Sequence, residues 1–84
     1  MKRTKRIQDI IEKNFNEFSI SVTDDSLAHK GHINFNGKEE THIIIELKKK
    51  FDLDFKRLEI HKKINTLLSN EFKLGLHALQ IKIT

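Results

Sequence analysis

The sequence has 84 residues, of which 37% are hydrophobic, so we expect one domain over residues 1–84 with a single core. It contains no cysteine, which excludes a disulfide scaffold and any metal site built on thiolates of this chain. The net charge is +4, a mild excess that permits contact with nucleic acid or an acidic partner without requiring either.

The first periodic segment predicts an amphipathic helix of about four turns. Its apolar residues at helical spacing are Ile7, Ile10, Ile11, Phe15 and Phe18. Residues 18–22 then alternate between apolar and serine side chains, which is typical of a short, half-buried strand. Residues 24–40 show little periodicity, and a loop of this length in so small a domain is more often functional than not.

The second half of the chain predicts a strand, a helix and a last strand. Residues 41–47 (THIIIEL) are rich in β-branched side chains, and residues 55–72 predict a helix, with a brief helical turn before it near residues 51–55. The predicted buried stripe of this helix is Leu58, Ile64, Leu67 and Leu68. Gly75 suits a helix C-terminus because it tolerates a positive φ. Residues 76–84 form the last strand, in which His77 begins the apolar face that Leu79 continues.

This order of elements, α-β-β-α-β, predicts an α+β two-layer sandwich with a three-stranded mixed sheet in strand order 1-2-3. The first two strands pair antiparallel, and the third lies parallel to the second after a helical crossover. No apolar run is long enough to span a bilayer, and no apolar segment follows the basic residues 1–6. We therefore expect a cytoplasmic protein.

The sequence carries no recognisable catalytic motif. It has no HExxH, no phosphate-binding glycine loop and no evident pair of carboxylates, so we expect a protein that is not an enzyme. The candidate metal ligands are the five histidines, because neutral imidazole binds metals.

The positions of the histidines leave both a structural and a ligating role open. His29 and His32 flank a glycine in the long loop, where the backbone can approach a bulky ligand closely. His42 is out of phase with the isoleucines that follow it, so we expect it to face away from the core or to cap the loop. His61 lies at a helical spacing that borders the core, and His77 starts the last strand.

Four segments together resemble the BolA-like protein family, from about Phe18 to Ile83. They are SLAHKGH (26–32), GKEETH (37–42), LEIHKKINTLL (58–68) and LHALQIK (76–82), and they occur in the family's order at nearly its spacing. The last is the most specific. The third departs from the family pattern, because it has Ile60 where the family usually has arginine.

The resemblance implies a fold similar to class II KH domains and a monothiol glutaredoxin as partner. Such pairs share a [2Fe–2S] cluster, to which the glutaredoxin supplies one cysteine and glutathione a second thiolate. The BolA-like chain supplies a histidine that matches His77 and a loop ligand, for which His32 matches best and His29 is the reserve. We expect an adaptor in iron–sulfur trafficking or iron sensing, which is monomeric and free of cluster when isolated.

The alternative is a KH-like nucleic-acid-binding transcriptional regulator of stress or morphology responses. The basic residues that would contact DNA are Lys56, Arg57, Lys62 and Lys63. The Gly-x-x-Gly loop by which KH domains grip RNA is missing between the predicted helices, so we expect weak DNA binding at most. A plain interaction domain without a metal is a third interpretation.

Overall fold

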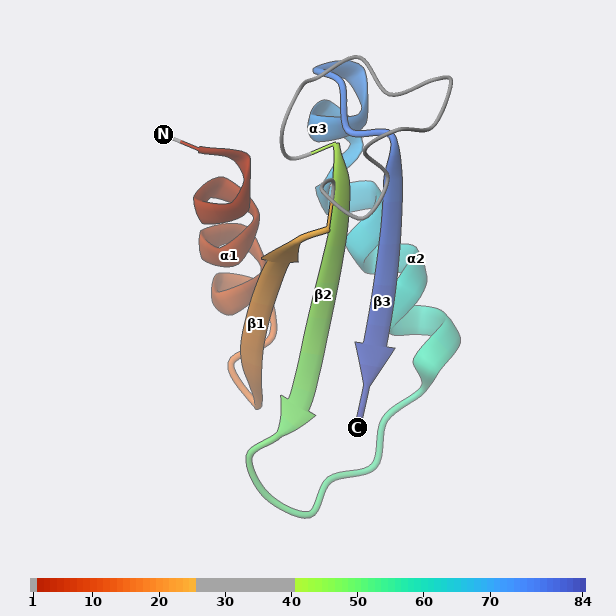
Figure 1. Ribbon diagram of the computed structural model, residues 1–84. Helices are drawn as coiled ribbons and strands as arrows, with labels where there is room; N and C mark the ends of the chain where they lie inside the picture. The colour runs from red at the N-terminus through yellow and green to blue at the C-terminus, as the bar shows by residue number, and fades with distance from the viewer. Residues whose placement is uncertain (1, 26–40) are drawn as a thin grey trace.

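The structure is a computed structural model that describes residues 2–25 and 41–84 (Figure 1). The elements of these residues, in chain order, are α1 (Arg3–Asn14), β1 (Phe18–Asp24), β2 (His42–Lys49), α2 (Arg57–Leu67), α3 (Ser69–Lys73) and β3 (Ala78–Ile83). Among the described helices, none has both the length and the apolar character needed to cross a membrane.

The three strands form one mixed sheet in the order β1-β2-β3, as the sequence predicted. β1 and β2 pair antiparallel, with Val22 opposite Ile45. β2 and β3 pair parallel, with His42 opposite Ala78 and Leu47 opposite Ile83. A parallel pair needs a crossover connection, which α2 and α3 provide. The predicted α+β class and the strand pairing are therefore confirmed.

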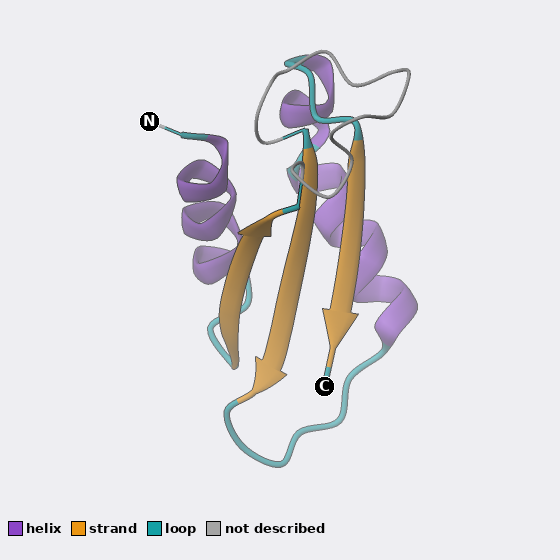
Figure 2. Cartoon of the chain, in the orientation of Figure 1, coloured by secondary structure: helices purple, strands orange, loops and turns teal. Residues whose placement is uncertain are grey.

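The helices cover one face of the sheet (Figure 2). Along each strand the side chains alternate between the two faces. In β2, Ile43, Ile45 and Leu47 are buried under the helices, whereas Glu46 and Lys48 are exposed on the opposite face. Such alternation is typical of a sheet with one packed face and one solvated face.

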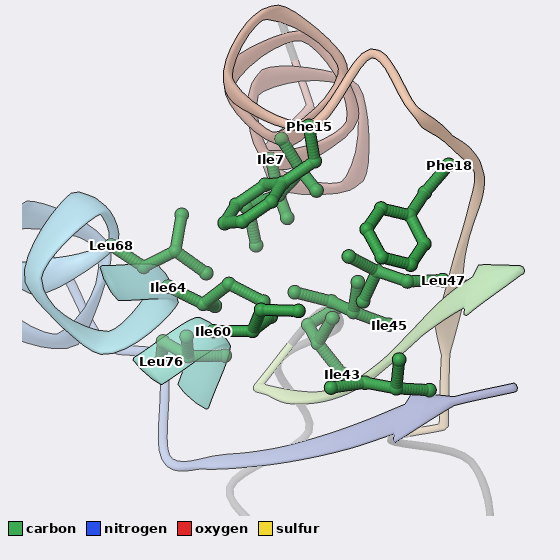
Figure 3. Packing of buried hydrophobic residues seen from close by; sticks show 12 residues of the cluster. Ile7, Phe15, Phe18, Ile43, Ile45, Leu47, Ile60, Ile64, Leu68 and Leu76 are labelled. Atoms are coloured by element: carbon green, nitrogen blue, oxygen red, sulfur yellow. The ribbon is translucent and has the colours of Figure 1, made fainter. Parts of the chain in front are cut away.

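The hydrophobic core lies between the helices and β2 (Figure 3). Five side chains of this core are fully buried: Ile7 on α1, Ile45 and Leu47 on β2, Ile64 on α2, and Leu68, which follows α2 directly. Fully burying a side chain of this size contributes roughly 1.5–3 kcal/mol. The core thus joins α1 and α2 to the central strand.

The first helix ends before the last residue of its predicted apolar stripe. α1 spans Arg3–Asn14, and Phe18 opens β1, as the alternation of residues 18–22 predicted. Phe18 is nevertheless buried, and its ring packs edge-on against Phe55 with 5.6 Å between the ring centroids. The predicted apolar stripe was therefore correct in its buried residues but not in its end.

The second predicted helix is divided into α2 and α3. Leu68 leaves the helical conformation (φ −99°, ψ 12°) while its side chain stays in the core. α2 begins at Arg57, because Lys56 is extended, and residues 51–56 contain no helical turn. The predictions of a single helix over residues 55–72 and of a helical turn before it were thus wrong.

The buried stripe of α2 also differs from the prediction. Leu58 is 66% exposed, and Ile60 takes its place in the core together with Ile64 and Leu68. Side chains four residues apart lie on the same face of a helix, so these three form one row toward the sheet. Leu58 lies off this row.

Candidate metal centre

The backbone around His77 is held on both sides. Gly75 adopts a φ of 116°, in the left-handed region that favours glycine, and reverses the chain after α3. Leu76 then enters the core. The N–H groups of His77 and Ala78 both donate to the carbonyl oxygen of Thr41, at 2.8 and 3.0 Å. The imidazole of His77, in contrast, is exposed.

A second imidazole lies beside His77. The rings of His42 and His77 stack with 5.6 Å between their centroids and 26° between their planes. His42 is half-buried, and its Nδ1 lies 3.0 Å from the hydroxyl oxygen of the buried Thr41. The parallel register places these histidines together, because His42 is opposite Ala78 at the start of β3. Thr41 therefore contacts both halves of the pair.

A model of the BolA-like protein family matches residues 11–84 of the chain. The chain belongs to the BolA-like protein family. The family resemblance noted in the sequence is therefore confirmed, and its most specific segment is the one that carries His77.

The BolA-like chain covers different shares of the length of three relatives. It is 33% identical to the UV-induced protein uvi31 of Schizosaccharomyces pombe, covering 96% of this chain and 82% of that protein. It is 30% identical to an uncharacterized protein in the cobS 5' region of Sinorhizobium sp, covering 98% and 89%. It is 28% identical to chloroplastic BOLA1 of Arabidopsis thaliana, covering 94% of this chain but only 51% of that protein. The chain thus spans about half the length of BOLA1.

Two solved structures share the fold of the BolA-like chain along its whole length. The BolA domain of SufE1 from Arabidopsis thaliana is 31% identical, with a TM-score of 0.78. BolA1 from Arabidopsis thaliana is 27% identical, with a TM-score of 0.77. Each match covers 100% of this chain and 92% of the other.

The donor chemistry of the histidine pair fits part of an iron–sulfur centre. Imidazole is a suitable ligand for iron, and two histidines on one iron are an established ligation of a [2Fe–2S] cluster. The BolA-like chain has no cysteine, so any thiolate ligand must come from another molecule. Within residues 2–25 and 41–84, no three or more His, Asp or Glu side chains are grouped as a metal site. The described residues bring two imidazoles side by side, those of His42 and His77.

The structure describes one of the three predicted ligands, His77. His32 and its reserve His29 lie outside the described residues. His77 was expected on the apolar face of the last strand, but β3 begins one residue later, and His77 is exposed against His42. His42 faces away from the core as predicted, but its pairing with His77 was missed. Only the register between β2 and β3 reveals this pairing, and local sequence patterns carry no signal for it. His61 is half-buried on α2, consistent with its expected position at the border of the core.

The four basic residues of the DNA-binding alternative are all exposed at the start of α2 and along it. Arg57 donates from Nη1 to the carbonyl oxygen of Ile83 at 2.7 Å. The Nζ of Lys63 lies 5.2 Å from the centroid of the Phe15 ring, within cation–π distance. Two of the four charges, those of Arg57 and Lys63, therefore pack onto the BolA-like chain itself, which leaves Lys56 and Lys62 as the stronger candidates for contact with phosphates.

Proposed function

We propose that this BolA-like chain is a non-enzymatic adaptor that binds a monothiol glutaredoxin and shares a [2Fe–2S] cluster with it, in iron–sulfur trafficking or iron sensing. The observation that carries the proposal is His77. Its imidazole is exposed, while its backbone is fixed by Thr41 and by the buried Leu76. A partner can therefore reach the ring without any rearrangement of the core.

The donors would be divided between the two proteins. His77 is the principal ligand from this chain and His32 the second, with His29 as reserve, while a glutaredoxin cysteine and glutathione supply the thiolates. Histidine in place of thiolate makes a cluster less negatively charged and raises its reduction potential. The residues of this chain would hold and orient one side of the cluster. A cluster of this composition suits transfer or sensing.

The test is co-expression of the full chain with a monothiol glutaredoxin, followed by visible circular dichroism of the purified pair. We expect a [2Fe–2S] spectrum from the wild-type pair and a loss of about tenfold or more in His77→Ala, comparable to the loss when a metal site is impaired. His61→Ala is the matched control, because it removes a half-buried imidazole from α2. A wild-type spectrum in the His77→Ala pair would contradict the assignment of His77.

The second candidate function is nucleic-acid binding, which the exposed basic residues of α2 favour. We expect weak, non-specific DNA binding, with a Kd of roughly 10⁻⁴–10⁻⁶ M at physiological salt. Neutralising Lys56 and Lys62 together should reduce the slope of log K against log salt by about two. A sequence-specific complex of much higher affinity would favour a transcriptional regulator over the adaptor.

A further inference from the structure

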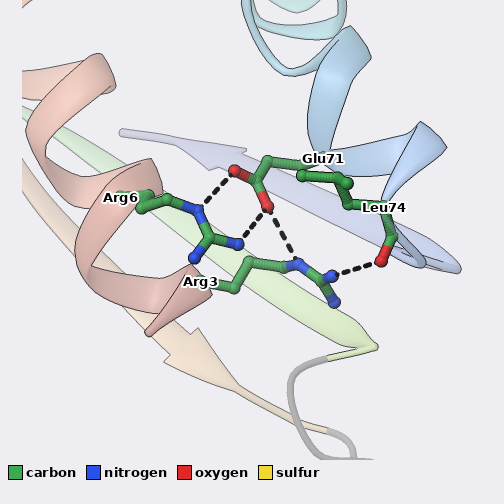
Figure 4. A network of polar contacts seen from close by, with 4 residues as sticks. All are labelled: Arg3, Arg6, Glu71 and Leu74. Atoms are coloured by element: carbon green, nitrogen blue, oxygen red, sulfur yellow. Dashed lines mark hydrogen bonds and ion pairs between the residues drawn. The ribbon is translucent and has the colours of Figure 1, made fainter. Parts of the chain in front are cut away.

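A buried carboxylate joins the first helix to the last. Glu71 on α3 is only 5% exposed, and both of its oxygens are bound by arginines of α1 (Figure 4). Arg6 donates from Nε and Nη2 to the two oxygens, each at 2.8 Å. Arg3 donates from Nε to Oε1 at 3.0 Å. Charge-assisted hydrogen bonds of this kind are strong. The guanidinium of Arg6 binds both carboxylate oxygens at once, and such a two-point contact is also geometrically specific. We call these three residues the clasp.

The clasp also contacts the backbone turn that leads to His77. Arg3 donates from Nη2 to the carbonyl oxygen of Leu74, at 2.9 Å (Figure 4). The carbonyl oxygen of Glu71 accepts a bond from the N–H of Leu76, also at 2.9 Å. Arg3 thus bridges the Glu71 side chain and the start of the turn. Glu71 is bonded through both its side chain and its backbone.

The position of Gly75 adds to this arrangement. It has a positive φ, and a β-carbon built on it would lie 3.6 Å from Nη2 of Arg3. The turn therefore depends on a flexible residue that holds an unusual conformation directly beside the clasp. Two residues later the chain reaches His77, whose N–H is bonded to Thr41. Only Leu76 separates Gly75 from His77 in the chain.

We propose that the Arg3–Arg6–Glu71 clasp is a positioning device that holds the turn at Leu74–Leu76 and thereby sets the orientation of the His77 imidazole; its role in cluster binding rests on the proposed function. Arg3 and Arg6 lie before residue 11, where the match to the family model begins. These two arginines thus lie outside the region that matches the family model.

Arg3→Lys is the sharpest variant. Lysine keeps the positive charge near Glu71, but a single ammonium cannot reproduce the guanidinium fork that reaches both Glu71 and Leu74. Glu71→Gln is the second variant, because it keeps the size of the side chain and removes its charge. Lys5→Ala is the matched control, since it removes an exposed ion pair with Asp9 from the same helix (3.1 Å) without touching the clasp.

The first readout is amide hydrogen exchange of the isolated full chain, measured by NMR under native conditions. We expect exchange of the Leu76 and His77 amides to become about tenfold faster in Arg3→Lys, because a charge-assisted bond that holds the turn is lost. The Ile45 amide in the central strand should change only as much as global stability changes. Lys5→Ala should leave both sets unchanged. Equal acceleration at Ile45 and His77 would mean that the clasp is merely stabilising, and would overturn the proposal.

The second readout is visible circular dichroism of each variant with a monothiol glutaredoxin. We expect the cluster signal to fall several-fold in Arg3→Lys and Glu71→Gln, and to be kept in Lys5→Ala. A wild-type signal in both clasp variants would overturn the role in cluster binding. If the wild-type pair itself holds no cluster, the proposed function fails, whereas faster exchange confined to the turn would still support the clasp as a positioning device. Unchanged exchange together with no wild-type cluster would overturn both.

Discussion

Thr41 is the residue on which two of the three described histidines, His42 and His77, converge. Its carbonyl oxygen accepts the N–H groups of His77 and Ala78, and its hydroxyl contacts the ring of His42. One residue, immediately before the start of β2, thus holds the backbone of His77 and contacts the ring of His42. Because the polar groups of Thr41 are used in this way, its burial is compatible with the rule that buried polar groups are hydrogen-bonded.

The second ligand can be identified by comparing His32→Ala with His42→Ala in the heterodimer. We expect His32→Ala to weaken the visible circular dichroism signal, and the double variant at His29 and His32 to remove what remains. His42→Ala should alter the signal less, because His42 supports His77 by stacking at 5.6 Å. If His42→Ala abolishes the signal while the loop double variant keeps it, the second ligand is His42.

The ionisation of Glu71 makes the free energy of unfolding vary with pH in the acidic range. The hydrogen bonds from Arg6, followed by those from Arg3, hold the pKa of Glu71 below its ordinary value of 4.5, against burial, which acts to raise it. A lowered pKa in the folded state means that the carboxylate contributes stability above pH 4.5. That contribution is lost as the pH falls through the folded-state pKa.

We therefore expect Glu71→Gln to lower the free energy of unfolding by about 2 kcal/mol at neutral pH, the usual scale for hydrogen bonds to a charged group. The difference between the variant and the wild type should shrink below pH 4.5 and vanish once Glu71 is protonated. Urea unfolding of both proteins from pH 7 to pH 2.5 measures this. A difference that stays constant over that range would contradict the assigned charge state.

At the scale of the elements, two apolar residues of α2 differ in whether they face the sheet. Ile60 is 9% exposed and Leu58 is 66% exposed, although they are two residues apart. We expect Ile60→Ala to lower the free energy of unfolding by about 2–5 kcal/mol, as is typical of truncating a core isoleucine. Leu58→Ala should change it by about 0.5 kcal/mol or less, as is usual for the surface. Urea unfolding of both variants is the measurement, and equal losses would show that the helix is rotated.

The strands could be predicted from the sequence because their burial is a local pattern. Ile43, Ile45 and Leu47 alternate with polar or less buried residues. This period of two identifies the face of β2 that is buried, and the buried face constrains the pairing of the strand. Their ends differ from the predicted ends by one or two residues. The parallel pairing followed from the intervening helix, since parallel neighbours require such a crossover.

The break between α2 and α3 could not be predicted in the same way. The pattern of residues 55–72 is compatible with one helix, but α3 places Glu71 where it meets Arg3, which is 68 positions away in the sequence. The partner of His42 is likewise found only through the β2–β3 register. Contacts between residues so far apart leave no trace in local periodicity. The predicted loop ligands His29 and His32 lie outside the described residues.

The whole molecule presents one packed face and one polar face of its sheet. Among the described residues, Ser19, Ser21, Lys48, Gln80 and Lys82 are exposed on the strands. Together with a net charge of +4, this surface disfavours self-association through the sheet. The core residues, in contrast, are enclosed by the two layers. The chain is thus expected to be monomeric and to depend on a partner for any metal cluster.

We propose that this chain holds a cluster only together with a partner, and the isolated protein tests this. Without cysteine, the chain supplies imidazoles only, and each iron of a [2Fe–2S] cluster needs two terminal ligands in addition to the bridging sulfides. We expect the purified chain to carry no visible chromophore after anaerobic incubation with ferric iron and sulfide and removal of the unbound iron and sulfide by desalting, and to run as a monomer of 9.9 kDa in light scattering. Adding a monothiol glutaredoxin and glutathione to the same sample should produce the visible spectrum. A stable brown species in the chain alone would show that its own histidines complete a cluster, and the division of ligands between two proteins would then be wrong.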